Sequence, residues 1–172
     1  MRPLGNIGNR GDFEDGKFCY RNRCCGYIIV DNRCNFTTQV RKIFFTKDIS
    51  RLDFEETNKV IKENIERSKE WILRSDKDFN ETYKQAGKGD LPFRLREYKI
   101  GNPDHSSRVS LAFPSLSTFM PAAIAVVEYK DGQVTIYRKN TRLMGYCFTG
   151  VVKEIMTKEV PKGLDEILEG VI

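Results

Sequence analysis

Apolar residues recur near helical spacing after residue 53, with Lys and Glu between them. They are Phe54, Ile61, Ile65 and Ile72. Asp53 can cap this helix, and Glu56, three residues later, completes a capping box. The same pattern over 78–81 predicts a shorter helix that ends at Gly87 or Gly89.

Strands are predicted where β-branched and aromatic residues cluster between turn residues. The predicted strands are 27–30, 39–46, 93–100, 122–130 and 134–138. The sequence Gly101-Asn102-Pro103 ends the third of these. Asp131-Gly132 is the preferred residue pair of a type I′ turn, which predicts that the last two strands form a hairpin.

The chain ends in a predicted helix, which begins at 151–156, breaks at Pro161 and resumes over 164–168. The predicted order is therefore strand, helix, strand, short helix, strand, hairpin and C-terminal helix. An antiparallel sheet with helices gathered on one face is an α+β fold. We divide the chain into a cysteine-containing N-terminal extension, 1–36, and an α+β domain, 37–172.

Composition and charge limit the classes of molecule that the protein is expected to bind. The 172 residues are 40% hydrophobic and 31% charged, which is ordinary for a globular protein, and the net charge is +5. Basic and acidic residues alternate over 53–81 instead of forming the single-sign stripe that nucleic acid requires, so we expect no nucleic-acid partner. No apolar run is long enough to span a membrane, and residues 1–6 lack the apolar run of a secretory signal. We therefore expect a cytoplasmic protein, and its Lys/Glu/Ile-rich helices would suit a thermophile.

Four short motifs follow one another at characteristic spacing. They are Gly101-Asn102-Pro103, Met120-Pro121-Ala122, Tyr129-Lys130-Asp131-Gly132 and Asn140-Thr141-Arg142-Leu143-Met144. In order and spacing they resemble the domain-of-unknown-function 302 family, over residues from about 40 to 168. The resemblance implies a TATA-binding-protein-like β-α-β-β-β-β-α arrangement that is commonly dimeric, and it brings no established reaction. Two positions depart from the family, since Ala122 replaces a cysteine and Thr141 replaces a proline.

The one histidine of the chain, His105, is the first candidate for catalysis. The stretch Asp104-His105-Ser106 contains the three residue types of a catalytic triad, but neighbours in sequence rarely converge as a triad does. We predict instead that His105 is an exposed residue of a turn. The sequence has no P-loop, no G-x-G-x-x-G and no H-E-x-x-H motif, so an enzyme is not favoured.

A ligand pocket is the alternative to catalysis, because the space between a curved sheet and its helices can hold a small molecule. Candidates to line it are Phe93, Tyr98, Phe113, Tyr137, Met144 and Cys147, although aromatic and Met positions at such spacings are more often core. Our ligand-binding candidates are Tyr98, Asn102, His105, Tyr137, Met144 and Cys147. Three of them, His105, Met144 and Cys147, are potential haem ligands, but a C-x-x-C-H attachment site is absent and no cofactor is assigned.

Four of the five cysteines lie within CYRNRCCGYIIVDNRC, residues 19–34. They are Cys19, Cys24, Cys25 and Cys34. The stretch has no C-x2-C knuckle, and the adjacent Cys24 and Cys25 point to opposite faces if extended. A turn over 20–23 would bring Cys19 to bridging distance of Cys24. We predict disulfides, with three pairings possible. The alternatives are a metal site formed by the same four cysteines, and free or exchanging thiols.

These observations favour a non-catalytic, homodimeric α+β domain, or a subunit of a protein assembly, that binds a small ligand or a partner protein. In this interpretation the extension enlarges the interface. The alternative is a redox or metal-binding enzyme, or an enzyme subunit, that uses the N-terminal cysteines together with Cys147.

Overall fold

The computed structural model describes residues 42–172, which lie within one compact unit. The predicted extension 1–36, with its hairpin and its cysteines Cys19, Cys24, Cys25 and Cys34, lies outside the described residues. Among the described residues, none of the helices combines the length and the apolar composition that crossing a bilayer requires.

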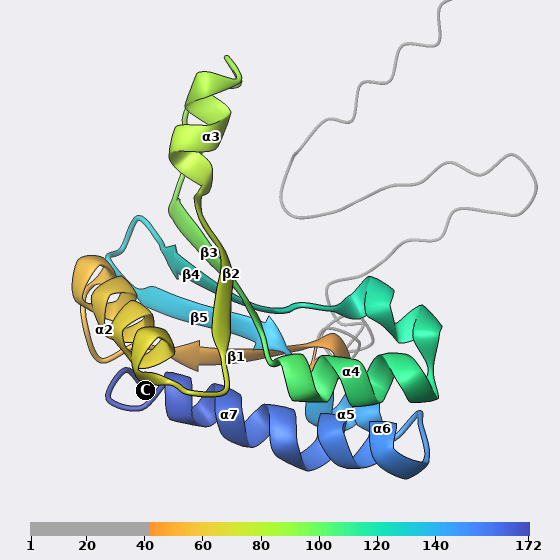
Figure 1. The fold of residues 1–172 in the computed structure, drawn as a ribbon. Coiled ribbons are helices and arrows are strands. Elements are labelled where there is room, and N and C mark those ends of the chain that lie inside the picture. The colour runs from red at the N-terminus through yellow and green to blue at the C-terminus, as the bar shows by residue number, and fades with distance from the viewer. Residues whose placement is uncertain (1–41) are drawn as a thin grey trace, which may run out of the picture. The chain divides into compact units, whose positions relative to one another are not determined.

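Five strands form one sheet in the order β1-β5-β4-β3-β2, and all neighbouring strands are antiparallel. The strands are β1 (Phe45–Ile49), β2 (Ile72–Asp78), β3 (Arg94–Gly101), β4 (Ala122–Glu128) and β5 (Val134–Lys139). The helices are α2 (Phe54–Arg67), α3 (Phe79–Gln85), α4 (Pro103–Ala112), α5 (Thr141–Gly145), α6 (Gly150–Glu154) and α7 (Val160–Ile167), with a 3-10 helix at Pro114–Phe119 and a π-helical turn at Ile155–Glu159. Helices α2 and α7 lie against one face of the sheet (Figure 1). The predicted antiparallel α+β fold is confirmed.

The core lies between this face and the two helices, because alternate strand residues point toward α2 and α7. Its fully buried side chains include Ile61, Ile65, Tyr98, Ile100, Ile124, Val126, Ile136, Leu164, Ile167 and Leu168. A second apolar cluster lies among α4, α6 and the π-helical turn and contains Val109, Leu116, Val152, Ile155 and Met156. The domain thus has a main core under the sheet and a smaller core beneath α4.

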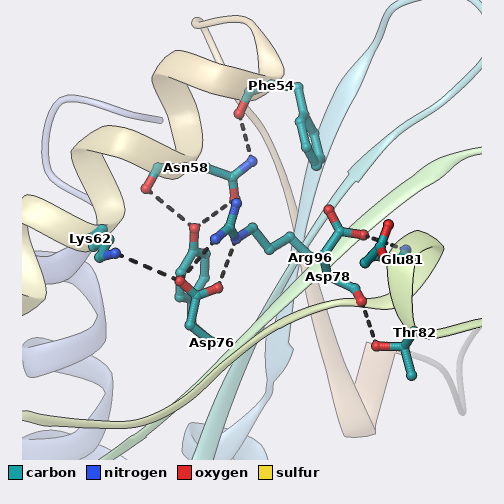
Figure 2. A network of polar contacts seen from close by, with 9 residues as sticks. Phe54, Asn58, Lys62, Asp76, Asp78, Glu81, Thr82 and Arg96 are labelled. Atoms are coloured by element: carbon teal, nitrogen blue, oxygen red, sulfur yellow. Dashed lines mark hydrogen bonds and ion pairs between the residues drawn. The ribbon is translucent and has the colours of Figure 1, made fainter. Parts of the chain in front are cut away.

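Polar side chains join α2 to the sheet within the main core. Asn58 on α2 accepts a hydrogen bond from the Tyr98 hydroxyl at 3.0 Å. Beside it, Arg96 donates two hydrogen bonds to Asp76, at 2.7 and 2.9 Å, and Lys62 reaches the same carboxylate from α2 (Figure 2). These contacts fix how α2 lies on β2 and β3, because each buried polar group has a partner there.

Both predicted helix caps are present. Asp53 accepts a hydrogen bond from the Glu56 backbone at 2.8 Å, and Asp78 accepts one from the Glu81 backbone at 3.1 Å. The strand predicted over 39–46 is placed wrongly, since residues 42–44 are helical and β1 runs from Phe45. The apolar run over 39–46 fits either a helix or a strand, and periodicity alone does not distinguish the two.

The helix predicted to include Ile72 ends earlier, at Arg67. Ser68 ends it, because its hydroxyl accepts hydrogen bonds from the backbone of Glu70 and Trp71 and turns the chain away. Ile72 therefore opens β2, and its match to the helical period carried no structural meaning.

Pro161 does not break the C-terminal helix, contrary to the prediction. The Val160 N–H bonds to the Ile155 carbonyl, five residues back, so the π-helical turn continues directly into α7. Pro161 is the second residue of α7 and directly follows this turn.

The predicted β4–β5 hairpin is present, but its turn is not type I′. The Gly132 N–H bonds to the Tyr129 carbonyl at 2.9 Å, so Lys130 and Asp131 are the central turn residues. Gly132 follows them with φ +79°, the positive value that a glycine after a type I turn supplies in a longer hairpin loop.

Candidate functional site

The candidate site begins where β3 gives way to α4. Asn102 caps α4, because its side chain accepts a hydrogen bond from the His105 backbone at 3.1 Å, and Pro103 occupies the first helical position. His105 therefore lies in the first turn of a helix, and its side chain is only 13% exposed. The prediction of an exposed turn histidine is wrong. The Asn-Pro pair is itself a helix-start signal, and it could have indicated α4 from the sequence.

The His105 side chain contacts residues from two distant elements. Its Nε2 lies 3.0 Å from Glu159 Oε2, on the π-helical turn. Its ring meets the Trp71 ring edge-on, with the centroids 5.7 Å apart. Its Nδ1 is buried and has no hydrogen-bond partner within the described residues. Trp71, which directly precedes β2, and Glu159 on the π-helical turn thus both contact the imidazole at the start of α4.

Glu159 is also held by Arg108, one helical turn after His105. The two guanidinium nitrogens lie 2.9 and 3.1 Å from the two carboxylate oxygens, and Asp104 contacts the same guanidinium at 3.2 Å. These two carboxylates raise the pKa of Arg108, and the hydrogen bonds that Arg108 donates to Glu159 are the largest cause.

Asp104, His105 and Glu159 have ligand atoms within 4.8 Å of one another, the spacing of a metal site. Arg108 argues against that assignment, because both oxygens of Glu159 already accept hydrogen bonds from its guanidinium. A divalent cation would have to displace this fixed positive charge or lie beside it. The cluster is better described as an ion-pair network that fixes α4 to the C-terminal helix.

A cavity of about 360 Å³ lies next to this network. Its apolar wall is formed by Trp71, Ile100, Met120, Pro121, Ala122 and Val160, and its polar residues are Arg74, Asn102, His105 and Ser106. A largely apolar wall with a few polar groups is typical of small-molecule sites, and the volume lies within their usual range.

Two of the polar residues have unused donors. Asn102 is 6% exposed and uses its Oδ1 as the helix cap, while its Nδ2 donates to no described residue. Arg74 forms no ion pair with any described residue. Ser106 donates its hydroxyl to the Pro103 carbonyl in its own helix.

Of the predicted ligand-binding residues, the structure brings Asn102 and His105 together at this cavity. Tyr98 lies in the main core, where burial raises the pKa of its hydroxyl to about 12. Tyr137 bonds to the Tyr129 hydroxyl at 2.8 Å, Met144 packs on the second apolar cluster, and Cys147 is an exposed free cysteine. None of these four lines the cavity.

The two remaining candidates also lie elsewhere, because Phe93 packs on Tyr129 and Phe113 packs on Phe148. Trp71, Arg74 and Glu159 were not predicted from the sequence as site residues. Trp71 is the single tryptophan of the chain, which is a signal of interest, but nothing local places it beside His105. The pairing of His105 with Glu159 joins residues far apart in sequence and depends on tertiary packing alone.

Comparison with known proteins supports this fold. No curated protein has a sequence that matches the chain. The crystal structure of an uncharacterized conserved protein DUF302 from Bacillus stearothermophilus is similar, with a TM-score of 0.59 and 20% identity over 72% of this chain and 98% of that one. The family described as "Domain of unknown function DUF302" matches residues 45–171, which include every residue that lines the cavity. The chain therefore belongs to the DUF302 family.

Proposed function

We propose that this domain is a non-catalytic binding module, which holds a small organic molecule in the cavity beside α4. The observation that carries the proposal is the cavity itself, of about 360 Å³, with its apolar wall and its unused donors. Binding of a ligand would supply partners for polar groups that have none among the described residues.

The arrangement favours binding over catalysis. The Ser106 hydroxyl, the nearest hydroxyl to His105 in sequence, donates to a backbone carbonyl of its own helix. His105 is held on its Nε2 side by Glu159, which Arg108 also engages. A nucleophile activated by an adjacent base would need its hydroxyl hydrogen-bonded to that base, and this pairing is not formed here.

The test uses the single tryptophan as a local reporter. Because Trp71 lines the cavity, its fluorescence should change when a molecule enters. A library of small organic molecules is screened on the full chain by thermal shift, and each hit is titrated against tryptophan emission. We expect hits that raise the melting temperature and alter the emission with the same midpoint.

Two neighbouring serines provide matched variants. Ser106 lines the cavity and Ser107 is exposed on the same helix. Ser106→Leu should weaken or abolish binding by filling the cavity, whereas Ser107→Leu should leave it unchanged. Hits that bind both variants equally would contradict the proposed location, and the absence of any hit would contradict the proposed function.

We also propose that the domain is a homodimer through the sheet face that α2 and α7 leave uncovered. The strand register places Lys47, Tyr137, Ala125 and Glu97 in one row across that face. Phe45 and Ile49 belong to the same face and are 55% and 56% exposed. A surface with exposed apolar side chains and both signs of charge suits a second copy of itself.

This association is measured as the molar mass of the full chain by light scattering after gel filtration. The expected mass is that of two chains. Ala125→Arg, in the middle of the face, should give single chains, while Ala86→Arg, an exposed position after α3, should not. A wild-type protein that elutes as a single chain would contradict the homodimer.

A further inference from the structure

We infer that the ligand of the cavity beside α4 is a small monocarboxylate, with its charged group at Arg74 and Asn102 and a short apolar body against Trp71 and Met120. The inference rests on the proposed function, and it names the chemistry of the molecule that the cavity takes. It follows from the charges, the hydrogen-bond donors and the apolar surfaces around the cavity.

Arg74 supplies the positive charge. The pairing of β2 with β3 shifts register between Leu73 and Ser75, so Arg74 is the extra residue of a bulge. Bulges re-aim a side chain out of the regular alternation of a strand, and here the Arg74 side chain lies at the cavity. A Cβ placed on Gly101 would lie 3.4 Å from Arg74 Nε, which shows that the arginine lies close against a position without a side chain.

No carboxylate of the described residues pairs with this guanidinium, although three lie on the neighbouring elements. Asp104 and Glu159 are both paired with Arg108, and Glu159 is also in contact with His105. Glu70 lines an adjacent hollow together with Lys69, which has the opposite charge. The one cation that faces the cavity without a partner among the described residues is therefore Arg74. Arginine is the side chain best suited to a carboxylate, because its planar fork matches the two oxygens.

Asn102 supplies a second, directed donor. Its side chain is more than nine-tenths buried and lines the cavity, and its Oδ1 is committed to the α4 cap. The orientation of the amide is thus set by the helix start, which leaves Nδ2 as a donor without a described partner. This amide N–H group is available to a molecule in the cavity, and a carboxylate oxygen would accept a hydrogen bond from it. A cationic ligand would leave this donor unsatisfied and would face Arg74.

The apolar wall determines the rest of the molecule. Trp71, Ile100, Met120, Pro121, Ala122 and Val160 surround a volume of about 360 Å³. This is at the lower end of the range for small-molecule sites, so the body is short and carries few polar groups. The Trp71 and His105 rings, which meet edge-on, offer aromatic surface to a planar body.

The experiment compares two probes of nearly the same shape, sodium benzoate and benzamide, at constant ionic strength on the full chain. Each is titrated against the fluorescence of Trp71, the single tryptophan. We expect benzoate to change the emission in a saturable manner and to bind about tenfold more tightly than benzamide, because only the carboxylate gains a charge-assisted hydrogen bond.

Arginine variants test whether the Arg74 charge is responsible for the preference for benzoate. Arg74→Gln should weaken benzoate binding about tenfold and leave benzamide binding unchanged. Arg51→Gln is the matched control, because Arg51 is exposed and does not line the cavity. Thermal melts of both variants show whether each is folded, and Arg74→Lys, which keeps the charge, should retain part of the preference.

The outcomes separate this inference from the proposed function. Equal binding of benzoate and benzamide would overturn the inference and leave a small-molecule site in place. Equal loss of benzoate binding in Arg74→Gln and Arg51→Gln would also overturn the inference, since the net charge of the protein would then explain the weaker binding. If neither probe changes the emission, the inference fails, and the library screen decides the proposed function independently.

Discussion

The position of Trp71 depends on Gly163, a residue of α7 without a side chain. A Cβ at position 163 would lie 2.3 Å from Trp71 Nε1 and 2.7 Å from its Cε2. Glycine is normally a poor helix residue, so its presence in α7 serves this close approach. Because Trp71 also touches His105 and lines the cavity, one glycine of the C-terminal helix sets the wall of the candidate site.

Gly163→Ala should therefore destabilise the domain although alanine favours helices. Overpacking usually costs about 1–3 kcal/mol, and the gain in helix propensity offsets roughly 1 kcal/mol of this, so we expect the free energy of unfolding to fall by up to about 2 kcal/mol. Urea denaturation measures the loss, and the tryptophan emission should shift because the ring is displaced.

A double variant tests whether contact with the Trp71 ring causes this loss of stability. In a Trp71→Phe background, which lacks the indole nitrogen, Gly163→Ala should cost clearly less than in the wild type. Unchanged stability of the single variant would show that Trp71 moves aside freely, and it would weaken the argument for a preformed wall.

At the scale of elements, the β4–β5 hairpin is held by a turn that needs positive φ at one residue. Gly132 has φ +79°, and no atom lies within 4 Å of where its Cβ would be. Residue 132 is therefore constrained by its backbone conformation and not by the space around its side chain. Lys130, a central residue of the same turn, is exposed and is not subject to it.

Gly132→Val should lower the free energy of unfolding by about 1–2 kcal/mol, because a β-branched residue tolerates the left-handed region poorly. Lys130→Val, in the same turn, should change it by much less. The comparison is made by thermal melting under identical conditions. Equal melting temperatures for the two variants would remove the turn assignment.

A second element-scale contact joins α2 to β3 through the Tyr98 hydroxyl and Asn58. Tyr98 is 1% exposed, and burial raises the pKa of its hydroxyl from 10.0 to about 12. The folded state thus favours the protonated phenol. Its stabilising contribution is complete below pH 10 and is lost as the pH rises toward 12, because the unfolded tyrosine ionises first.

The free energy of unfolding should therefore fall by about 2–3 kcal/mol between pH 9 and pH 12 through this residue. Urea denaturation across that range measures the fall in the wild type and in Tyr98→Phe, which should lack this part of the pH dependence. Tyr146→Phe, at an exposed position, should retain it. Identical slopes for all three proteins would contradict the assignment of the shift to Tyr98.

At the scale of the whole molecule, the described residues bury two apolar clusters. The sheet, α2 and α7 bury one cluster, and α4, α6 and the π-helical turn bury another. We predict that residues 37–172 fold alone. Circular dichroism of that fragment should show a helix and strand spectrum with a cooperative thermal transition. A disordered spectrum would mean that residues 1–36 are part of the core.

The cysteines allow a second measurement on the whole chain. We predict disulfides among Cys19, Cys24, Cys25 and Cys34, so Cys147 should be the one reactive thiol under denaturing, non-reducing conditions. Thiol titration together with elemental analysis checks this. Five reactive thiols with stoichiometric zinc or iron would favour the metal or redox alternative.

The sequence by itself determined the features that depend on a few adjacent residues. The Asp53 and Asp78 caps, the β4–β5 hairpin and the strand that ends before Asn102-Pro103 are all of this kind. Each is local, because a cap or a turn satisfies backbone groups within three or four residues. Their order was enough to predict an antiparallel α+β fold.

Tertiary structure alone decided the candidate site. The approach of Glu159 to His105 requires the C-terminal helix to pack beside α4, and the π-helical turn determines where Glu159 lies on that helix. Likewise, Trp71 reaches His105 only because α7 has no side chain at Gly163. Periodicity reports which face of an element is buried, but not which distant element covers it. The cavity, and the placement of Arg74 and Trp71 beside it, therefore depend on how distant elements pack together.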